Sequence, residues 1–254
     1  MAPSDRAWQK PPDQRVLLGM LTPSSNTILE PVCADMLREM AEVTAHFARF
    51  RVTSIALDDR SLGQFDTAPM LDAASLLADA RVRSICWNGT SASWLGLATD
   101  RRLCAAITAG TGIPATSSVL ALMELCRRNQ VKRLGLVTPY TADVQARIIA
   151  TFRQEGIDCI ADRRLDIADN FSFALASAAT LSDMVRDVAQ ARPDAITVLC
   201  TNLRGAPLAP ALEAETGTLI LDSVAVALWD SLRLAGADPA RLASHGRLFT
   251  TPVK

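Results

Sequence analysis

The sequence contains an internal repeat, with similar segments in the same order in its two halves, and this duplication constrains the fold more than any other feature. The segment Leu18–Pro23, with the sequence LGMLTP, returns as Leu134–Pro139, with the sequence LGLVTP. Further along each half, residues 84–91 correspond in position to residues 195–202. Two like halves tend to place equivalent loops opposite each other, with a ligand between them. The duplication therefore predicts two lobes and one shared site.

Length and composition agree with two lobes and exclude several kinds of partner. The 254 residues are enough for two lobes of about 100 residues each, and a hydrophobic content of 49% supplies a sizeable core. The net charge is −1, from 26 basic and 27 acidic residues, so we expect no nucleic-acid partner. No apolar run approaches the roughly 20 residues of a membrane helix, so we expect no membrane partner. Residues 1–15 are polar and lack the apolar core of a secretory signal, and we expect a flexible tail there.

Cysteine and histidine usage predicts neither a metal site nor a cofactor. The chain has six cysteines, none in C-x-x-C spacing, and only two histidines, His46 and His245, which we interpret as structural. Free thiols of this kind are typical of a reducing cytoplasm, which is the expected location. Neither a G-x-G-x-x-G nor a G-K-[ST] run is present, so a dinucleotide or P-loop site is not expected.

Apolar runs and helical spacing alternate along both halves. Strands are predicted at 15–21, 45–53, 83–87, 113–116, 133–137, 158–164, 195–199 and 219–221. Helices are predicted at 30–40, 72–80, 93–110, 117–128, 141–155, 182–191, 207–215 and 223–235. Strands joined by helical crossovers form a parallel sheet that helices cover on both faces.

The predicted fold class is therefore α/β, with two pseudo-symmetric lobes, each a parallel sheet flanked by helices. We place the first lobe at 16–117 and the second at 118–223, and residues 224–254 could complete the first. Ligands of such sheets bind beyond the carboxyl ends of the strands. Four polar turns lie at those ends, and we expect them to line one cleft between the lobes: 22–26, 88–91, 138–141 and 200–202.

Equivalent positions in two of these turns differ in a way that matters for chemistry. One half offers Gly89 and the other Cys200, so a facing pair would hold a single thiol. Cys200 follows an apolar strand and precedes small polar residues, and a nearby helix N-terminus would lower its pKa. We interpret Cys200 as a catalytic residue. The alternative is a small buried core residue, which is our interpretation of Cys86 and Cys126.

Two further segments offer donors for a negatively charged ligand. Gly89, Thr90 and Ser91 combine hydroxyls with backbone N–H groups at the start of a predicted helix, which suits a carboxylate or an enediolate. A simple helix cap is the alternative. Tyr140 is the only tyrosine of the chain, and its phenol could donate to an oxyanion or could merely pack in a half-buried position.

A second carboxylate or other polar group would need its own donors. Pro23, Ser25 and Asn26 lie in the first polar turn, where hydroxyl and amide groups occur together. Thr201 and Asn202 follow Cys200 directly, and we expect both to contact the substrate. Helix capping is the alternative role for the serines of the first turn.

These motifs resemble the aspartate/glutamate racemase superfamily from Val16 to Phe249, and its closest branches are maleate cis–trans isomerase and arylmalonate decarboxylase. The decarboxylase-like segments are Gly89–Gly96, which is similar to the dioxyanion loop, Leu136–Val144, which is similar to the oxyanion tyrosine segment, and Trp229–Gly236, which is similar to the C-terminal helix. Thr22–Thr27 and Cys200–Arg204 look like the maleate isomerases. The resemblance implies a two-lobed α/β enzyme that needs neither metal nor cofactor.

The resemblance also bears on the reaction. Racemases and maleate isomerases of this kind use one cysteine from each lobe, whereas this chain has Gly89 in place of the first, as the decarboxylases do. We therefore expect a cofactor-independent lyase that decarboxylates a malonate-type diacid. Thr90, Ser91 and Tyr140, with the N–H of Thr201, would hold an enediolate that Cys200 protonates.

Other functions remain open at this point. One alternative is a maleate isomerase or a racemase of a small carboxylic acid. Another, from a different class, is a non-catalytic carboxylate-binding protein. The expected partner in every case is a small mono- or dicarboxylate, and the chain could form a homo-oligomer.

Overall fold

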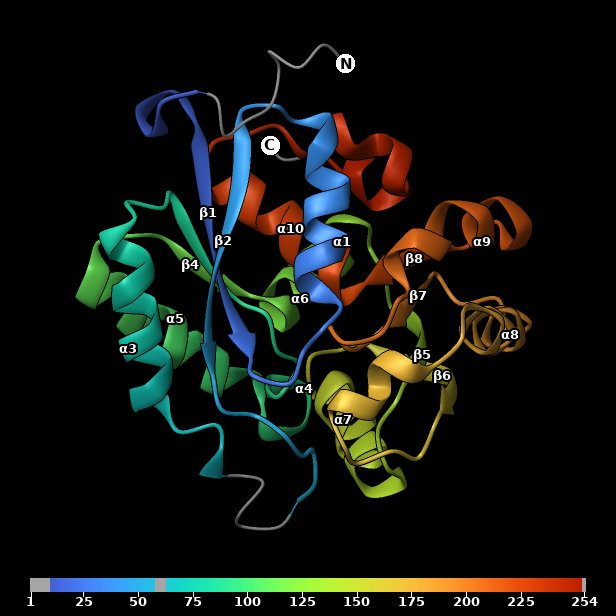
Figure 1. The fold of residues 1–254 in the computed structure, drawn as a ribbon. Coiled ribbons are helices and arrows are strands. Elements are labelled where there is room, and N and C mark those ends of the chain that lie inside the picture. The colour runs from blue at the N-terminus through green and yellow to red at the C-terminus, as the bar shows by residue number, and fades with distance from the viewer. Residues whose placement is uncertain (1–9, 58–62, 253–254) are drawn as a thin grey trace.

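Two four-stranded parallel sheets form the frame of the molecule. The computed structural model describes residues 10–57 and 63–252. The strand orders are β2-β1-β3-β4 and β6-β5-β7-β8, and every pair of neighbouring strands is parallel. Figure 1 shows the first sheet beside α3 and α5, and the second beside α7, α8 and α9. The strands are β1 Val16–Pro23, β2 Val43–Phe50, β3 Ser84–Trp87, β4 Ala115–Ser117, β5 Arg133–Thr138, β6 Asp158–Arg164, β7 Ala195–Val198 and β8 Leu219–Asp222.

The two sheets have the same strand order once four is added to each strand number, so the predicted duplication and the predicted fold class are confirmed. Helices connect successive strands, as parallel pairing requires. The helices are α1 Leu29–Met36, α3 Thr67–Asp79, α4 Ala92–Leu95, α5 Leu97–Thr111, α6 Ser118–Arg128, α7 Ala142–Gln154, α8 Ala178–Ala189, α9 Ala209–Thr216 and α10 Ser223–Leu234.

Two predicted helices differ from the observed ones, one because it is interrupted and the other because it ends early. The helix predicted over 93–110 is two helices, α4 and α5, because the backbone turns at Gly96, where φ is 94°. Residues that carry a side chain rarely adopt this positive φ angle, whereas glycine adopts it without steric cost. The helix predicted over 30–40 ends as an α-helix at Met36 and continues only as a 3-10 turn over Leu37–Glu39.

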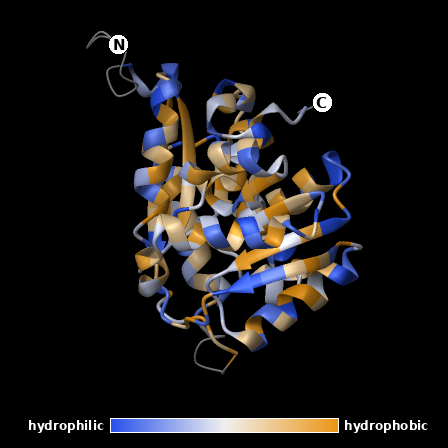
Figure 2. Cartoon of the chain, turned by 90° about the vertical axis from the view of Figure 1, so that its right-hand side faces the viewer, coloured by the Kyte–Doolittle hydropathy of each residue, from blue (hydrophilic) through white to orange (hydrophobic). Residues whose placement is uncertain are grey.

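The edge strands β2 and β6 are less buried than the other strands, β8 at the opposite edge of the second sheet included. All residues of β3, β7 and β8 are buried, whereas most of β2 and β6 is only partly buried. Figure 2 shows the same distribution, with apolar residues on the inner strands and polar ones on the outer surfaces. Central strands of a covered parallel sheet are apolar on both faces, which explains the short apolar runs in the sequence.

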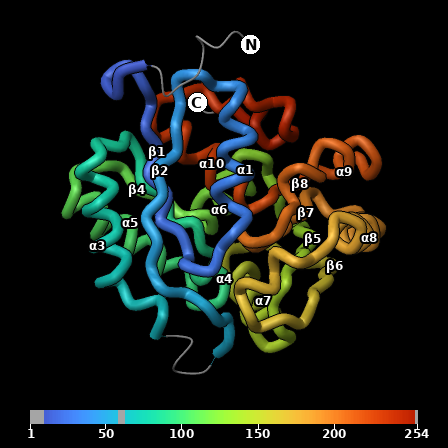
Figure 3. The backbone as a smooth tube through the Cα atoms, viewed as in Figure 1, coloured from blue at the N-terminus to red at the C-terminus, as the bar shows by residue number. Residues whose placement is uncertain are grey.

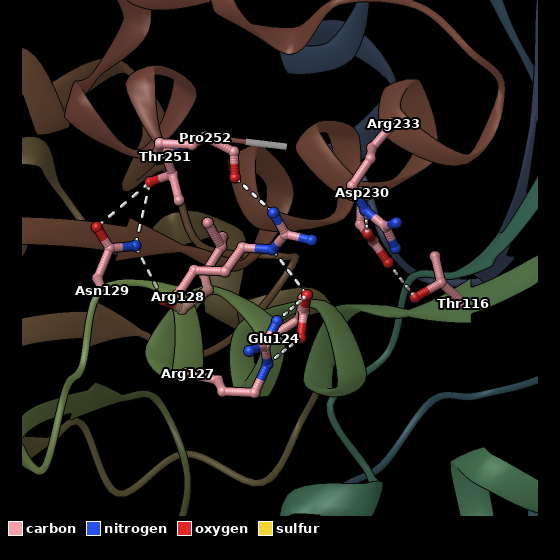
Figure 4. A network of polar contacts seen from close by, with 10 residues as sticks. Thr116, Glu124, Arg127, Arg128, Asn129, Asp230, Arg233, Thr251 and Pro252 are labelled. Atoms are coloured by element: carbon pink, nitrogen blue, oxygen red, sulfur yellow. Dashed lines mark hydrogen bonds and ion pairs between the residues drawn. The ribbon is translucent and has the colours of Figure 1, made fainter. Parts of the chain in front are cut away.

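Helices α6 and α10 form the joint between the halves. They pack against each other, and both also contact β4. Thr116 donates a 2.6 Å hydrogen bond to Asp230, and the Arg128 side chain reaches both Glu124 and the carbonyl of Pro252. Figure 4 shows this polar network at the ends of the two helices. The lobe boundaries at 117 and 223 stay predictions, as does the assignment of 224–254.

Candidate active site

The four polar turns at the strand ends meet, as predicted, and hydrogen bonds join them. The amide of Asn26 donates to the Thr201 hydroxyl at 3.1 Å, and that hydroxyl donates to the carbonyl of Asn88 at 2.8 Å. The hydroxyls of Thr90 and Tyr140 lie 2.5 Å apart. Each of these bonds crosses from one turn to another, so the turns form one continuous polar seam. Figure 3 shows the backbone of the two halves that these turns belong to, with β1 and β2 on one side and β5 to β8 on the other.

A small cavity lies at this seam. Its volume is about 20 Å³, which is room for a single water molecule. Six of the residues predicted to form the site line it: Pro23, Gly89, Thr90, Tyr140, Cys200 and Thr201. Six residues that sequence reasoning missed also line it: Val52, Ile55, Phe65, Trp87, Trp94 and Asn170. The apolar residues among these make the cavity lining less polar than the sequence motifs alone suggested.

Cys200 lies in this cavity as a protonated thiol. Complete burial raises its pKa to about 12, although the N–H of Asn202 and the hydroxyl of Tyr140 hydrogen-bond to the sulfur and partly oppose the shift. The predicted lowering of the pKa by a helix N-terminus is wrong. After β7 the chain makes a turn, and the next helical segment starts only at Ala206. A thiol with such a pKa can give a proton at neutral pH, but it is a poor nucleophile.

Tyr140 combines the two roles that the sequence left as alternatives. Its ring packs edge-on between Trp94 and Phe173, with centroid separations of 5.2 and 5.5 Å. Its hydroxyl faces Thr90 and the sulfur of Cys200. Burial raises the pKa of Tyr140 well above its usual value, so the phenol stays protonated and can donate. The packing fixes the direction in which this donor points.

Gly89 has no room for a side chain. A Cβ added there would lie 2.0 Å from Cζ2 of Trp87, closer than any real contact. The indole is itself held in place by Phe50, whose ring centroid is 5.0 Å away. Trp87 therefore occupies the position that a second cysteine at residue 89 would need.

Ser91 does not line the Cys200 cavity, although it is close to Gly89 in the sequence. It lines a neighbouring cleft between α3 and α5 rather than the Cys200 cavity. It is the N-cap residue of α4, but the cap has no side-chain hydrogen bond. The helix-cap alternative for Thr90 and Ser91 is therefore wrong, although Ser93 does donate to the carbonyl of Thr90 at 2.6 Å.

Asn26 does cap a helix. Its Oδ1 accepts the N–H groups of Ile28 and Leu29, both at 3.0 Å, at the start of α1. Its Nδ2 is bonded to Thr201 across the seam. Asn26 therefore supports the cavity wall from behind and is not one of the lining residues.

Ser25 and Asn202 are held in the same supporting layer by a residue that the sequence analysis missed. Asn170 donates from Nδ2 to the Ser25 hydroxyl at 2.7 Å, and its carbonyl accepts from Nδ2 of Asn202 at 2.6 Å. Ser25 donates onward to the carbonyl of Val52 at 2.7 Å. Neither Ser25 nor Asn202 lines the cavity, whereas Asn170 does.

Asn170 belongs to a short strap that closes the seam. The segment 52–55 follows β2, and the segment 168–170 follows β6. Ile55 N–H donates to Ala168 at 2.9 Å, Asn170 N–H donates to Thr53 at 3.1 Å, and Ser54 and Asp169 form an antiparallel bridge. The two segments occupy equivalent positions in the two halves, so the duplication was a signal that could have revealed them.

The two histidines take no part in the cavity. His46 lies on β2 with Nε2 3.0 Å from the Thr44 hydroxyl, and His245 lies 3.1 Å from Glu39. Over residues 10–57 and 63–252, no group of His, Cys, Asp and Glu is arranged to hold a metal ion. In the same ranges no helix is both long and apolar enough to cross a membrane.

Comparison with known proteins places the chain in a family. Residues 26–249 match the arylmalonate decarboxylase family. The arylmalonate decarboxylase of Bordetella bronchiseptica is 32% identical over 164 residues, which cover 63% of this chain and 68% of the relative. A maleate isomerase of Pseudomonas putida is 25% identical over 234 residues, covering 87% and 92% of the two chains. The chain belongs to the arylmalonate decarboxylase family.

Solved structures agree with this assignment. The maleate cis–trans isomerase of Nocardia farcinica, bound to TRIS, superposes with a TM-score of 0.83 at 25% identity, covering 92% of this chain and 97% of the other. A crystal structure of arylmalonate decarboxylase superposes with a TM-score of 0.72 at 26% identity, covering 93% and 100%. The predicted resemblance to the decarboxylase and isomerase branches is therefore confirmed. The protein is an enzyme of this decarboxylase and isomerase group, whose members act on small carboxylic acids.

Proposed function

We propose that the protein is a cofactor-independent lyase that decarboxylates a malonate-type diacid through an enediolate, which Cys200 protonates. The observation that carries this proposal is that the sulfur of Cys200 lies in the cavity and is protonated. Of the six cysteines, only Cys200 lines the cavity, and its raised pKa keeps it as a thiol. A protonated thiol beside fixed hydroxyl donors suits the protonation of a carbanion.

The donors around the cavity suit the carboxylate that stays on the substrate. The hydroxyls of Thr90 and Tyr140 hold it together with the N–H of Thr201, and Ser91 adds a donor from the same loop as Thr90 once the substrate widens the cavity. Negative charge builds up on these oxygens as the enediolate forms. Preorganised donors therefore stabilise the transition state more than the ground state.

The reaction balances without any added group. The bond between the α-carbon and one carboxylate breaks, and that carboxylate leaves as carbon dioxide. Its bonding electrons remain on the α-carbon and spread into the other carboxylate, which gives the enediolate. The Cys200 thiol then donates its proton to the α-carbon, and the resulting thiolate regains a proton from water.

The apolar lining explains why the leaving carboxylate would be destabilised. Val52, Ile55, Phe65 and Trp87 contribute no charge to the cavity. A carboxylate placed against such side chains loses hydration, whereas neutral carbon dioxide does not depend on it. The Asn170 amide is the polar exception in this wall, and we assign it, with Ser25 and Asn26 behind it, to a second polar group of the substrate.

Isomerisation is the rival reaction, and two features weigh against it. Trp87 fills the position of a second thiol beside Gly89, and the raised pKa of Cys200 disfavours the thiolate that would add to a double bond. The relatives are enzymes, and nothing in the comparisons supports a non-catalytic carboxylate-binding protein.

The test is a product assay in deuterium oxide with the purified protein. Methylmalonate, phenylmalonate and maleate are supplied separately, and carbon dioxide, fumarate and α-deuteration are measured. We expect carbon dioxide and a singly deuterated acid from a malonate, and loss of most turnover in Cys200→Ser. Cys104→Ser, a buried cysteine outside the cavity, is the matched control. Fumarate formation from maleate without carbon dioxide release from any malonate would establish the isomerase instead.

A further inference from the structure

Another cavity lies at the amino ends of β1 and β3, whereas the Cys200 cavity lies beyond the carboxyl ends of the strands. Its volume is about 350 Å³, which is within the size range of small-molecule sites. We call it the β1–β3 pocket. In Figure 1, β1 starts near the N-terminus at the top, and its arrowhead points down toward α4. A strand of eight residues, such as β1, spans roughly 26 Å. A small ligand in this pocket is therefore remote from the reacting atoms.

Three arginines line the β1–β3 pocket: Arg15, Arg81 and Arg83. Arg15 comes directly before β1, Arg83 comes directly before β3, and Arg81 lies in the turn between α3 and β3. β1 and β3 are neighbouring parallel strands, and the N–H of Arg83 donates to the carbonyl of Leu17 at 2.7 Å. The sheet topology thus brings three guanidinium groups from two segments to one pocket.

The protein does not neutralise this positive charge. Over residues 10–57 and 63–252, none of the three guanidinium groups takes part in an ion pair, and Nε of Arg15 is buried without a hydrogen-bond partner. Asp13 is the acidic member of the lining among the described residues. Three positive charges and one negative charge leave an excess of two positive charges. Like charges in one pocket repel each other, and an anion would offset this repulsion.

The second half of the chain has an acidic residue at the position equivalent to Arg83. Residues 84–91 correspond to residues 195–202, so Asp194 is the counterpart of Arg83. The carboxylate of Asp194 accepts the N–H groups of Lys132 and Arg133 at 2.9 and 2.8 Å. The second sheet therefore has a negative group of its own at the amino ends of its strands. The first sheet carries a cation there instead and is open to a negative group from outside.

We propose that the β1–β3 pocket binds a small phosphomonoester, whose phosphate group is held by Arg15, Arg81 and Arg83. Guanidinium groups match phosphate oxygens with paired N–H donors. The two negative charges of the phosphate balance the excess charge of the lining. The organic part of the ligand packs on the apolar members of the lining, which are Pro12, Leu17 and Ala80. The inference does not depend on the proposed function, because the pocket lies away from Cys200.

The first experiment measures binding of phenyl phosphate to the purified protein by calorimetry at pH 8 and constant ionic strength. We expect one site, and we expect Arg15→Gln and Arg83→Gln each to lower the affinity at least tenfold. Arg101→Gln is the matched control, because Arg101 is exposed, pairs with Glu155 and lies outside the pocket. Absence of binding, or equal binding by all of these variants, would overturn the proposal.

The second experiment changes the charge of the ligand and keeps its shape. Benzenesulfonate has the ring and the tetrahedral head of phenyl phosphate, but it carries one negative charge where the phosphate carries about two at pH 8. We expect it to bind at least fivefold more weakly than phenyl phosphate to the unmodified protein. This preference should shrink in Arg83→Gln. Equal affinity of the unmodified protein for both ligands would contradict the assignment of a phosphate site.

The third experiment distinguishes the β1–β3 pocket from the Cys200 cavity, whose hydroxyl donors can also hold an anion. Tyr140→Phe removes one of those donors, and we expect this variant to bind phenyl phosphate as the unmodified protein does. Phenyl phosphate should also raise the melting temperature of the unmodified protein and of Tyr140→Phe, but not that of Arg15→Gln/Arg83→Gln. Binding that Tyr140→Phe weakens and the arginine variants leave unchanged would place the phosphate beside Cys200 and refute the proposal.

Discussion

The Thr90 hydroxyl lies 2.5 Å from the Tyr140 hydroxyl, so that the first half of the chain contributes one member of the pair and the second half the other. Each hydroxyl has only its neighbours to fix its direction, because both side chains are buried. Tyr140 also donates to the sulfur of Cys200. The Thr90 hydroxyl, the Tyr140 hydroxyl and the Cys200 sulfur thus form a continuous line of hydrogen-bonding groups. A ligand oxygen that enters the cavity can accept the hydrogen bond that one of these hydroxyls now gives to its neighbour.

Replacing Tyr140 by Phe should separate catalysis from stability. The ring contacts with Trp94 and Phe173 would persist, and only the hydroxyl would be lost. Loss of one oxyanion donor costs about 10²–10³ in kcat, and we expect a fall of that order, with a much smaller change in KM. Steady-state kinetics on the reactive malonate measure this, and a urea melt of the same variant checks that the fold is intact. A kcat within a factor of three of the unmodified enzyme would contradict the assigned role.

Introducing a second thiol at residue 89 should be destabilising because of Trp87. The added side chain must displace an indole that is packed against Phe50, and overpacking of this kind costs about 1–3 kcal/mol. Gly110→Cys is the matched control, because a Cβ there meets nothing within 4 Å. Urea unfolding of both variants measures the difference.

A double-mutant cycle isolates the contact. In Gly89→Cys/Trp87→Ala the overlap is absent, so the double variant should be less destabilised than the sum of the two single variants. Strict additivity would mean that the indole does not occupy the space above residue 89. The free energy of unfolding from the same urea melts provides all four corners of the cycle.

The strap over the seam should have to open for turnover. The cavity beneath it, at about 20 Å³, has room for only one water molecule, and a diacid is much larger. Ser54 and Asp169 are directly opposed, and the two flanking backbone bonds make them a non-hydrogen-bonded antiparallel pair. The Cα atoms of such a pair are about 4.5 Å apart, a separation that a disulfide tolerates.

Ser54→Cys/Asp169→Cys is therefore expected to cross-link under oxidising conditions and to lose most activity, because the strap is then locked. Addition of a reductant should restore turnover, and each single variant should be insensitive to the redox state. Cross-linking is quantified by thiol titration and activity by carbon dioxide release. A fully cross-linked protein with normal turnover would show that the substrate enters elsewhere.

Much of the fold could be predicted from the sequence because the duplication and the apolar runs are local signals. β6 was predicted with its observed bounds, and the four turns meet where the strand ends place them. The break at Gly96 was missed because a single glycine within a helical pattern does not reveal its φ angle. The raised pKa of Cys200 was missed for a different reason, since burial depends on the strap and on Trp87, which approach from distant parts of the chain.

The supporting role of Ser25, Asn26 and Asn202 also lay beyond the sequence. Residue type and position at a strand end suggested that these side chains would line the cavity, and only the hydrogen bonds to Asn170 and Thr201 place them behind it. Short polar residues serve equally well as ligand donors and as backbone or side-chain partners. Which role each has depends on contacts between the halves, and local sequence patterns do not encode those contacts.

Asp100 should make the stability of the protein depend on pH. Burial raises its pKa from 3.8 to about 7, so the folded state holds the proton more tightly than the unfolded state does. Its contribution is therefore fully present below about pH 4, is lost as the pH rises to about 7, and is constant above that. The slope from one such group is at most about 1.4 kcal/mol per pH unit.

Asp100→Asn removes the titrating group and retains a similar shape. The free energy of unfolding of this variant, minus that of the unmodified protein, should rise between pH 4 and pH 7 and level off above. Taking the difference cancels the buried Asp222, whose pKa burial also raises to about 7 and which is present in both proteins. Urea melts at several pH values measure it, with Asp72→Asn at an exposed position of α3 as the matched control. A difference independent of pH would mean that Asp100 does not hold a proton in the folded state.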